Sequence, residues 1–580
     1  MTELFLGPKA KASHAIIALT VLYFVVTAWN LHIQQIVSPD EPRYAVAARN
    51  MMNGGDMFVP VYNTDQHLEK PAFFHWLLVI AGTVANRVGL RLDLAFRFVP
   101  LLMGWAAVIG TYLFGRMLFN GRAGFLSAII LMTSYQFHNT ARELVVDMTL
   151  TAFLLWSWVL FYVALKRIES GVRPFGALLG FYLCLGLACL TKGPFLVGIF
   201  SAVPLLAYLF WTRRIAVLLR AGLWWGVPLS LALGLTWVTV VTLKGHDAGS
   251  FFSVQNLDRF VGKTDHQSYL PFWRYIKLLP QIFAPAVVLV PFAIWWTVSR
   301  ARQGLSNLSD SAKMLTCALG ISFLIIGISI SKRPLYMVPL FPHLSLWIAL
   351  YIDQTFLSAE GSPGTSPLVN ALRAAGVLLL GGCASSIWWL RGIGGQNAEV
   401  ISCVCLGVAM LLAAFTAASF LKAGQRLSAA LRLSVIALLL AIGVEAVVRP
   451  IHERALSVAQ FYAEVSPKVG DRSLLVLAKN MNPNDASWYL GNAGGRRIDR
   501  VFEWDLKARF FDAPGTPLLV EVPLLLKSPV LKDSVIKRSD ELFRDETPFV
   551  LVEPDPAHPP DPALFKPRPP KKAREILENL

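Results

Sequence analysis

Apolar and polar stretches alternate through the first three quarters of the chain, and the apolar stretches are long enough to cross a membrane. Most hold about 17 to 25 residues with few charges, the length that a helix needs to span the hydrocarbon core. The pattern predicts an α-helical polytopic membrane protein with about thirteen transmembrane helices. The predicted spans are residues 14–36, 94–118, 123–137, 148–165, 175–190, 195–211, 221–243, 275–298, 314–330, 335–352, 371–390, 400–421 and 433–448.

One further apolar run, Ala72–Leu90, is close to spanning length but contains His75, Asn86 and Arg87. Cytoplasmic loops of membrane proteins are rich in lysine and arginine. If this run lies in the membrane interface and the N-terminus is cytoplasmic, every basic cluster between the later spans falls inside. If the run crosses, those clusters all fall outside. The charge pattern therefore predicts interfacial helices in a first external loop, residues 38–93, and places the C-terminal region on the same side.

From about Pro450 the pattern changes to short apolar runs that are typical of strands. These are Ser473–Ala478, Pro517–Val522 and Phe549–Val552, with a helix-like stretch at Asp485–Leu490. The sequence thus predicts a transmembrane domain over residues 1–449 and a small soluble α/β domain over residues 450–580, which is extracytoplasmic and ends in a proline-rich tail.

The composition agrees with this division and excludes several classes of protein. Of the 580 residues, 55% are hydrophobic and 16% are charged, which is unlike a water-soluble enzyme. The net charge of +16 would suit a nucleic acid. However, the basic residues form short clusters between apolar runs, so we expect contact with membrane lipids and no nucleic acid. All six cysteines lie in apolar segments, which predicts buried thiols rather than disulfides or metal ligands.

The start of the first external loop is the most concentrated group of charges next to a predicted span. Charged groups at this depth are costly, so they indicate a functional site. Residues 38–41 have the pattern Ser-x-x-Glu with Pro39 at the first helical position, which predicts a helix to about Asn53. An alternative is that Asp40 and Glu41 only cap this helix and favour its dipole.

The residues that could carry out chemistry are acids and bases on the predicted external face. The sequence has no G-x-G-x-x-G pattern, no phosphate-binding P-loop and no D-x-D pair, so we expect no cofactor and see no indication of a metal site. Arginine and lysine suit phosphate oxygens, which favours a substrate whose phosphate is anchored in lipid. The external basic residues are Arg43, Lys70, Arg97, Arg142, Lys192, Arg259, Lys332 and Arg333.

Several motifs in fixed order resemble one family. They are DEPRYAVAARNMMNGGDMFVPVYN…EKPAFFHWL, RFVPLLMGWAAVIGTYLFGRMLFNGRAGFLSAIIL, REL…D at 142–147, LTKGP at 190–194, FFSVQNLDRFVG…DHQSYLPFWRYI and SKRPLYMVPLFPHLSL. Over about residues 14–350 the chain resembles the ArnT-like branch of the GT-C membrane glycosyltransferases, which is related to the protein O-mannosyltransferases. That family transfers a sugar from a polyprenyl phosphate to a lipid or protein outside the cytoplasm.

The resemblance implies a role for individual residues. The acids that match catalytic positions are Asp40, Glu41 and Asp147. The residues that match ligands of the donor phosphate are Arg43, Lys70, Arg259 and Tyr336. Supporting positions are Tyr44, Glu69, Arg142, Lys192, Lys332 and Arg333. The tyrosine that usually precedes the Glu-Lys pair is replaced by His67 and Leu68, which leaves the identity of the sugar open.

Structural roles remain as alternatives for some of these residues. Arg142 and Asp147 could form an interfacial ion pair, and Lys332 and Arg333 could reach toward lipid headgroups. Tyr336 could be an interfacial anchor.

Together, the residues and the resemblance predict an integral-membrane glycosyltransferase of a bacterial inner membrane. It would use a polyprenyl-phosphate sugar as donor, and a lipid similar to lipid A or a protein as acceptor, on the extracytoplasmic face. Asp40 would orient or deprotonate the acceptor, and the basic residues would stabilise the departing phosphate. A transporter or flippase for lipid-linked sugars is one alternative, but it should show internal repeats and charges at the bilayer midplane. A membrane scaffold with a soluble binding domain is another, and it leaves the charged loop unexplained.

Overall fold

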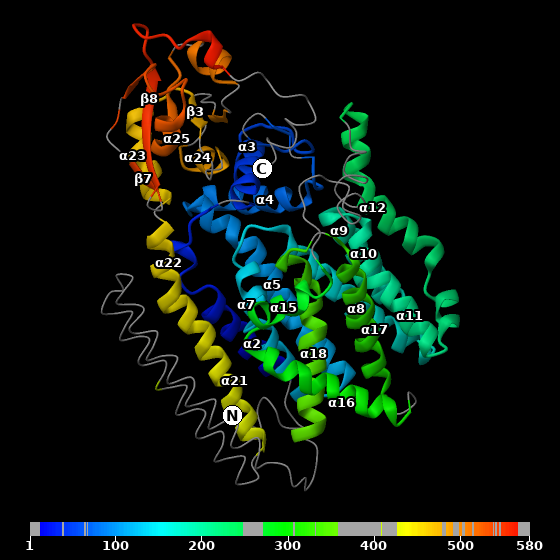
Figure 1. The fold of residues 1–580 in the computed structure, drawn as a ribbon. Coiled ribbons are helices and arrows are strands. Elements are labelled where there is room, and N and C mark those ends of the chain that lie inside the picture. Colours follow the sequence, from blue (N-terminus) through cyan, green and yellow to red (C-terminus); the bar gives the residue numbers. More distant parts are fainter. Residues whose placement is uncertain are drawn as a thin grey trace.

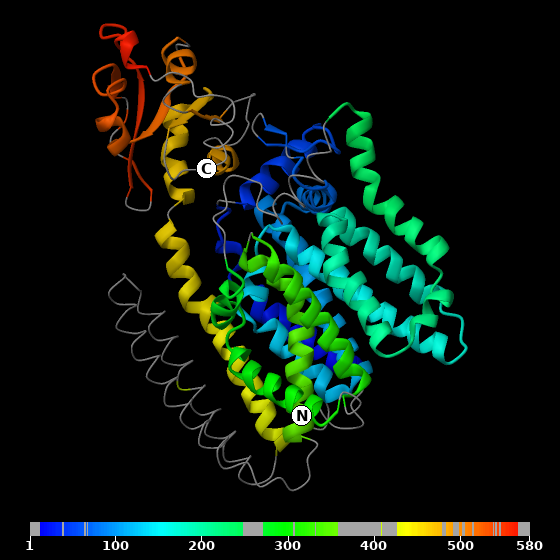
Figure 2. The same ribbon diagram turned by 45° about the vertical axis from the view of Figure 1, so that its right-hand side comes forward.

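Helices dominate the structure, and a small sheet lies at one end of the helical bundle (Figures 1 and 2). The computed structural model describes residues 12–37, 40–62, 65–66, 68–246, 271–304, 308–330, 332–357, 408, 426–456, 458–477, 483–490, 498–501, 505–512, 515–537, 539, 542–544 and 547–565.

The longer helices form the bundle. They are α2 (Ala12–Thr27), α4 (Phe73–Val88), α5 (Leu92–Leu118), α6 (Gly121–Met132), α8 (Val146–Glu169), α9 (Phe175–Lys192), α12 (Leu223–Leu243), α16 (Val290–Arg302), α17 (Asp310–Ile328), α18 (Phe341–Ile352) and α21 (Arg426–Gly443). Shorter helices and turns complete it: η1 (Leu31–Ile33), α3 (Glu41–Met52), α7 (Tyr135–Thr140), α10 (Pro194–Val197), η2 (Gly198–Ala202), α11 (Val203–Trp211), η3 (Ile215–Arg220), α15 (Arg274–Ile282), η5 (Ala286–Leu289), η7 (Pro334–Leu340), η8 (Asp353–Leu357), η9 (Val444–Val448) and α22 (Arg449–Leu456).

Nine helical stretches among the described residues are long and apolar enough to cross a membrane, so the chain is a multi-pass membrane protein. They are residues 12–33, 92–118, 146–169, 175–192, 194–211, 223–243, 310–328, 334–355 and 432–469. Each overlaps one predicted span. The predicted spans at 371–390 and 400–421 lie outside the described residues.

The predicted span at 123–137 is wrong as a single helix. The chain forms α6, ends it, and then forms the short helix α7. The hydroxyls of Thr133 and Ser134 donate to the carbonyls of Ile129 and Ile130, at 2.8 and 2.7 Å. Such bonds compete with the regular helical pattern. The 12 residues of α6 are shorter than the roughly 20 needed to span the hydrocarbon.

The predicted span at 275–298 is also not one helix. Prolines at 280, 285 and 291 lack the amide hydrogen that a continuous helix requires. The chain is divided instead into α15, η5 and α16. As a consequence Tyr275 lies in a separate short helix and not at the start of a long span.

The centre of the bundle is α8, which packs against α5 and α9, while α9 packs against α12 and α5 against α6. The α5–α6 contact is close because glycines face each other there. A Cβ on Gly124 would lie 2.5 Å from the carbonyl oxygen of Tyr112 and 2.7 Å from the amide nitrogen of Arg116. These are backbone atoms that cannot move aside, so this crossing requires glycine at position 124.

The run at 72–90 forms α4, a 16-residue helix that packs against α3 and α5. Its outer face carries exposed apolar side chains, among them Ile80, Val84 and Val88. The helix is shorter than a typical span. Its location in the membrane interface stays a prediction.

The C-terminal part of the described chain contains a six-stranded mixed sheet with the order β4-β3-β5-β8-β6, and β7 also pairs with β8. The elements are α23 (Val458–Val469), β3 (Leu474–Leu477), α24 (Pro483–Leu490), β4 (Ile498–Arg500), η12 (Lys507–Phe511), β5 (Leu518–Glu521), α25 (Val522–Lys527), β6 (Val535–Lys537), β7 (Leu542–Arg544), β8 (Thr547–Pro554) and η13 (Pro562–Leu564). The three predicted strands and the predicted helix correspond to β3, β5, β8 and α24. The division into two domains at residue 449 stays a prediction.

This C-terminal region contacts the start of the chain, where its helix α24 packs against α3 (Figure 1). The guanidinium of Arg49 donates to the carbonyls of Trp488, at 2.9 Å, and Ser487, at 2.5 Å. The hydroxyl of Tyr489 accepts from the amide of Ile36 at 3.1 Å. In the sequence between α3 and α4, two short antiparallel strands pair, β1 (Val61–Tyr62) and β2 (Asp65–Gln66).

Candidate active site

Asp40 is the residue before α3, at the N-cap position, but its carboxylate makes no capping hydrogen bond. It accepts instead from Arg333 at 3.0 Å, across 293 residues of sequence. The helix begins at Glu41 and has Pro42 in its first turn, so it starts two residues later than the pattern suggested. The alternative in which Asp40 only caps α3 is therefore wrong, because its carboxylate points to the bundle.

A pocket in front of Asp40 brings together most of the predicted site. It encloses about 1050 Å³, part of which is open to the outside. The predicted site residues among its lining are Asp40, Tyr44, Glu69, Lys70, Asp147, Lys192, Arg333 and Tyr336. They come from the ends of α3, α8 and α9, the turn before α4, and η7. Eight of the thirteen predicted site residues thus lie around one space, although the sequence separates them by up to 296 positions.

The cations of the pocket are held by specific contacts. The ammonium of Lys192 lies 2.5 Å from a carboxylate oxygen of Asp147 and 5.0 Å from the centre of the Tyr336 ring. The ammonium of Lys70 donates to the hydroxyl of Tyr44 at 2.8 Å. An aromatic face attracts a cation without neutralising it. The arrangement therefore places three positive charges, including Arg333, around one space with the carboxylates of Asp40, Glu69 and Asp147.

Electrostatics keep Asp40 ionised. Burial alone would raise the pKa of its carboxyl, but the positive charges of Arg333, Lys70 and Arg43 outweigh that effect. The pKa of Asp40 is therefore held below its ordinary value. Burial and the neighbouring carboxylates raise the pKa of Tyr44, so this phenol stays neutral.

The pocket also has apolar lining residues. Its lining includes Leu150, Phe195, Leu196, Ile199, Phe200, Ile326, Leu335 and Pro339, which come from α8, α10, η2, α17 and η7. A space lined by both charged groups and hydrocarbon side chains suits an amphipathic ligand, with a charged head and a lipid chain.

Glu41 does not line this pocket, contrary to its expected catalytic role. Its carboxylate forms a buried ion pair with Arg97, with a shortest distance of 2.7 Å. The same carboxylate accepts from the amides of Leu144 and Val37, at 2.9 and 3.3 Å. These contacts use both oxygens, and they support a structural role in holding the start of α3.

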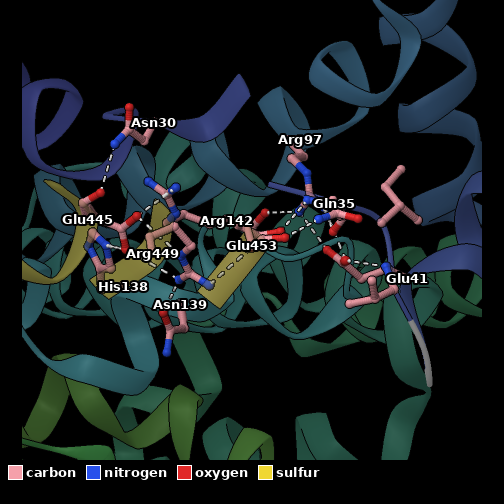
Figure 3. Close-up of polar contacts among 12 residues, drawn as sticks. Asn30, Gln35, Glu41, Arg97, His138, Asn139, Arg142, Glu445, Arg449 and Glu453 are labelled. Carbon is pink, nitrogen blue, oxygen red and sulfur yellow. Dashed lines mark hydrogen bonds and ion pairs between the residues drawn. The ribbon is translucent and has the colours of Figure 1, made fainter. Parts of the chain in front are cut away.

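Arg142 is also outside the pocket, in a buried ionic network that reaches the last described membrane helix (Figure 3). It forms an ion pair with Glu445 at 2.8 Å and donates to the carbonyls of Thr27 and Trp29. Glu445 also contacts His138 at 3.0 Å and Arg449 at 3.3 Å. The alternative of an ion pair between Arg142 and Asp147 is wrong, because Asp147 pairs with Lys192.

Three further predicted residues have other positions. Arg43 lies over the ring of Tyr62, 5.7 Å from its centre, and is not part of the pocket lining. The buried ammonium of Lys332 donates to the carbonyl of Ser329 and so does not extend toward headgroups. Arg259 lies outside the described residues.

Two residues that sequence reasoning missed lie at the site. Tyr275 lines the pocket with a fully buried side chain, and its hydroxyl has no hydrogen-bond partner among the described residues. Glu143, in the loop between α7 and α8, lines a second pocket that also includes Asp40. Both occur within motifs that carry the family resemblance, which was the one available signal. The described residues contain no group of three or more His, Cys, Asp or Glu that could hold a metal ion.

Known proteins match this chain in sequence and in fold. The sequence model of the dolichyl-phosphate-mannose-protein mannosyltransferase family matches residues 69–239. An undecaprenyl phosphate-alpha-4-amino-4-deoxy-L-arabinose arabinosyl transferase from Proteus mirabilis is 28% identical over 351 residues, which are 59% of this chain and 60% of that protein. A transferase of the same name from Erwinia tasmaniensis is 27% identical over 57% of each chain.

The fold comparison extends over nearly the whole chain. The crystal structure of ArnT from Cupriavidus metallidurans bound to undecaprenyl phosphate superimposes with a TM-score of 0.71 and 20% identity, over 96% of this chain and 99% of that one. The chain has an ArnT-like fold. The apo form of the same ArnT gives a TM-score of 0.68. The ArnT-like arrangement thus includes the C-terminal region as well as the helical bundle.

The sequence similarity to these relatives covers a smaller part of the chain than the structural similarity to ArnT does. The chain spans about 60% of the length of the first relative it matches and 57% of the second. The match with the mannosyltransferase family model begins at Glu69 and includes Lys70, Asp147 and Lys192.

Proposed function

We propose that the chain is an integral-membrane glycosyltransferase that transfers a sugar from a polyprenyl-phosphate donor to a lipid acceptor similar to lipid A, or to a protein. The observation that carries this proposal is the pocket that brings Asp40 and Asp147 together with Lys70, Lys192, Arg333 and Tyr336 and that also has apolar lining residues. Two of its relatives are named undecaprenyl phosphate-alpha-4-amino-4-deoxy-L-arabinose arabinosyl transferases, which supports the same donor class.

The donor would bind with its phosphate among the cations and its polyprenyl chain along the apolar side. Lysine contributes a point charge to phosphate oxygens and arginine a planar fork. Lys70 and Lys192 would contact the phosphate, and the hydroxyls of Tyr336 and Tyr275 would donate hydrogen bonds to it. Tyr275 supports this role because its buried hydroxyl has no partner among the described residues.

The reaction would be a single displacement at the anomeric carbon. The acceptor oxygen forms a bond to that carbon, and the bond between the carbon and the phosphate oxygen breaks. Its electron pair leaves with the polyprenyl phosphate, whose growing charge the lysines and Arg333 stabilise. Asp40, which is ionised, accepts the proton of a hydroxyl acceptor or orients an acceptor that is already an anion.

We further propose that the pocket and the C-terminal region face the extracytoplasmic side of a bacterial inner membrane. Asp40 directly precedes α3, and α24 packs directly against α3, so the pocket and the sheet are on the same side of the bundle. The basic clusters between the spans support a cytoplasmic location for the opposite side.

Mass spectrometry of envelope lipids and glycoproteins from a deletion strain tests the function in cells. Complementation with the native chain should restore one glycosylated species, and the Asp40→Asn chain at the same abundance should not. An unchanged set of glycosylated lipids and proteins in the deletion strain would contradict the proposal. Restoration by the Asp40→Asn chain would remove Asp40 from the mechanism.

A further inference from the structure

Four of the apolar residues that line the first pocket, the one in front of Asp40, come from one continuous stretch of chain. They form the apolar wall: Phe195, Leu196, Ile199 and Phe200. This stretch is not a regular α-helix, because α10 passes into η2, a π-helical turn at Gly198–Ala202, before α11 begins. Turns of this kind are rare inside helices and often occur at functional sites. Here the turn carries two of the four residues of the wall.

Pro204 explains why the π-helical turn leaves two carbonyl groups without their usual helical donors. In an α-helix the amide of residue 204 donates to the carbonyl of Phe200, but proline has no amide hydrogen. The amide of Val203 donates to Gly198, five residues earlier, rather than to Ile199. The carbonyls of Ile199 and Phe200 therefore lose the backbone donors that a regular helix would provide.

Two buried side chains from neighbouring helices supply the missing donors. The indole NH of Trp158, on α8, donates to the carbonyl of Phe200 at 2.8 Å. The hydroxyl of Ser322, on α17, donates to the carbonyl of Ile199 at 2.9 Å. Both side chains are 0% exposed. Because a buried carbonyl without a donor is costly, these two contacts stabilise the π-helical turn relative to other shapes of the same segment.

Neither Trp158 nor Ser322 lines the first pocket, so neither is placed to touch a ligand there. Each lies on a helix that does contribute to the lining. Asp147 is in the first turn of α8, and Ile326 on α17 follows Ser322 by one turn. The two hydrogen bonds therefore connect the apolar wall to the helix that carries a carboxylate of the pocket and to the helix that carries another apolar residue.

We propose that Trp158 and Ser322 are positioning residues for the donor, and that they hold the apolar wall in the shape that receives the isoprenoid chain next to the phosphate. This inference rests on the proposed function and concerns the hydrocarbon part of the substrate. A hydrocarbon chain makes no directional bonds, so its binding depends on the shape of the surface it packs against. If the binding shape is only partly populated, the apparent affinity falls by the same fraction. The two hydrogen bonds keep this shape populated before the lipid arrives.

Displacement of undecaprenyl phosphate from the purified chain tests this role, with farnesyl phosphate and inorganic phosphate as the two competing probes. Trp158→Phe and Ser322→Ala each remove one donor and keep a small or aromatic side chain in place. Each should weaken the binding of farnesyl phosphate about tenfold, the scale of one unsatisfied buried carbonyl. The binding of inorganic phosphate should change less than about twofold, because a ligand without a chain does not distinguish the shapes of the wall. A partly unfolded chain would instead have fewer sites with unchanged affinity for both probes.

The matched controls are Trp237→Phe and Ser230→Ala, which remove the same kinds of hydrogen bond elsewhere in the bundle. The buried indole of Trp237 donates to the carbonyl of Phe58 at 2.7 Å. The hydroxyl of Ser230 donates to the carbonyl of Tyr182 at 2.8 Å. None of these four residues lines the first pocket. Both controls should therefore keep the native affinity for both probes.

The outcomes separate this inference from the proposed function. If the native chain binds neither undecaprenyl phosphate nor farnesyl phosphate, the proposed donor class is wrong. If it binds both, but the two variants keep the native affinity for farnesyl phosphate or lose affinity for both probes equally, the inference is wrong and the proposed function stands. A thermal melt identifies a variant that has not folded, and the other variant then decides. Failure of both to fold would also overturn the inference, because the two side chains would then serve the fold as a whole.

Discussion

The Asp40 carboxylate lines two pockets, and the positive charges around it explain why it is ionised. Arg333, Lys70 and Arg43 hold its pKa below the ordinary value, so it is ionised at neutral pH. Replacement by asparagine keeps the shape and removes the charge. We expect Asp40→Asn to slow single-turnover transfer by about two orders of magnitude or more, the usual scale for a general base or orienting acid.

The control for that variant is donor affinity, which should stay near the native value, with an unchanged melting temperature. Near-native turnover in folded Asp40→Asn protein would exclude Asp40 as the acting carboxylate. Asp147 would then be the leading candidate, because Glu41 is committed to Arg97.

Lys192 and Asp147 form an ion pair at the edge of the first pocket, so their effects are coupled. Lys192→Met should weaken binding of the donor about 10- to 150-fold, which corresponds to about 1.5–3 kcal/mol for a lost bond to a charged group. Isothermal titration with undecaprenyl phosphate measures this directly. The double variant with Asp147→Asn should be less impaired than the sum of the two single variants, because neither then leaves an unpaired charge.

The burial of Glu143 makes a prediction about stability. A carboxyl whose folded-state pKa is raised to about 7 binds a proton between its unfolded value and pH 7 only when the chain is folded. The protein therefore loses stability as the pH rises through this range. Glu143→Gln should raise the melting temperature at pH 8 relative to the native chain, and little or not at all at pH 5. An equal effect at both pH values would contradict the raised pKa.

At the scale of elements, α3 is held in place by the pairing of Glu41 with Arg97, whose side chains are 9% and 1% exposed. Removal of one partner leaves a buried charge, which costs about 3–5 kcal/mol. We expect Arg97→Met to lower the melting temperature and the transfer rate together. Arg97 lies in α5. The matched control is Arg91→Met at the start of α5, because Arg91 forms an ion pair with Asp93 but its side chain is 65% exposed. Such exposed pairs contribute about 0–1 kcal/mol, and a loss of stability as large as that of Arg97→Met would contradict this account.

The sequence predicted those elements that are marked by a long apolar run, because length and hydropathy alone define a spanning helix. It did not predict the breaks. Residues 275–298 look like one apolar run, yet three prolines divide them. The strands β4, β6 and β7 have three residues each, too few to show an alternating pattern.

The site was predictable as far as the family motifs reach. Their order and spacing gave eight of the residues that line the first pocket. They could not show that Glu41 and Arg142 are structural, because this depends on Arg97 and Glu445, which lie 56 and 303 positions away in the sequence. The same limit hid Glu143 and Tyr275, because their burial and their contacts with other described residues are set by the fold.

At the scale of the whole molecule, the orientation in the membrane is the main open prediction. Single cysteines at Asn53 and Lys468, both exposed, should react with an impermeant thiol reagent added outside the inner membrane. A cysteine at Gln303, at the end of α16, should react only after the membrane is opened. Labelling requires a background without the six native cysteines, which must retain activity. Reaction at Gln303 with protection at Asn53 would reverse the orientation.

The most direct test of the account is transfer by the purified chain in detergent or lipid, with a radiolabelled undecaprenyl-phosphate sugar as the donor. The account predicts that label moves to lipid A or to a protein acceptor without any nucleotide sugar, and that Asp40→Asn abolishes nearly all of this transfer. Transfer from a nucleotide sugar alone, with no lipid-linked donor present, would contradict it.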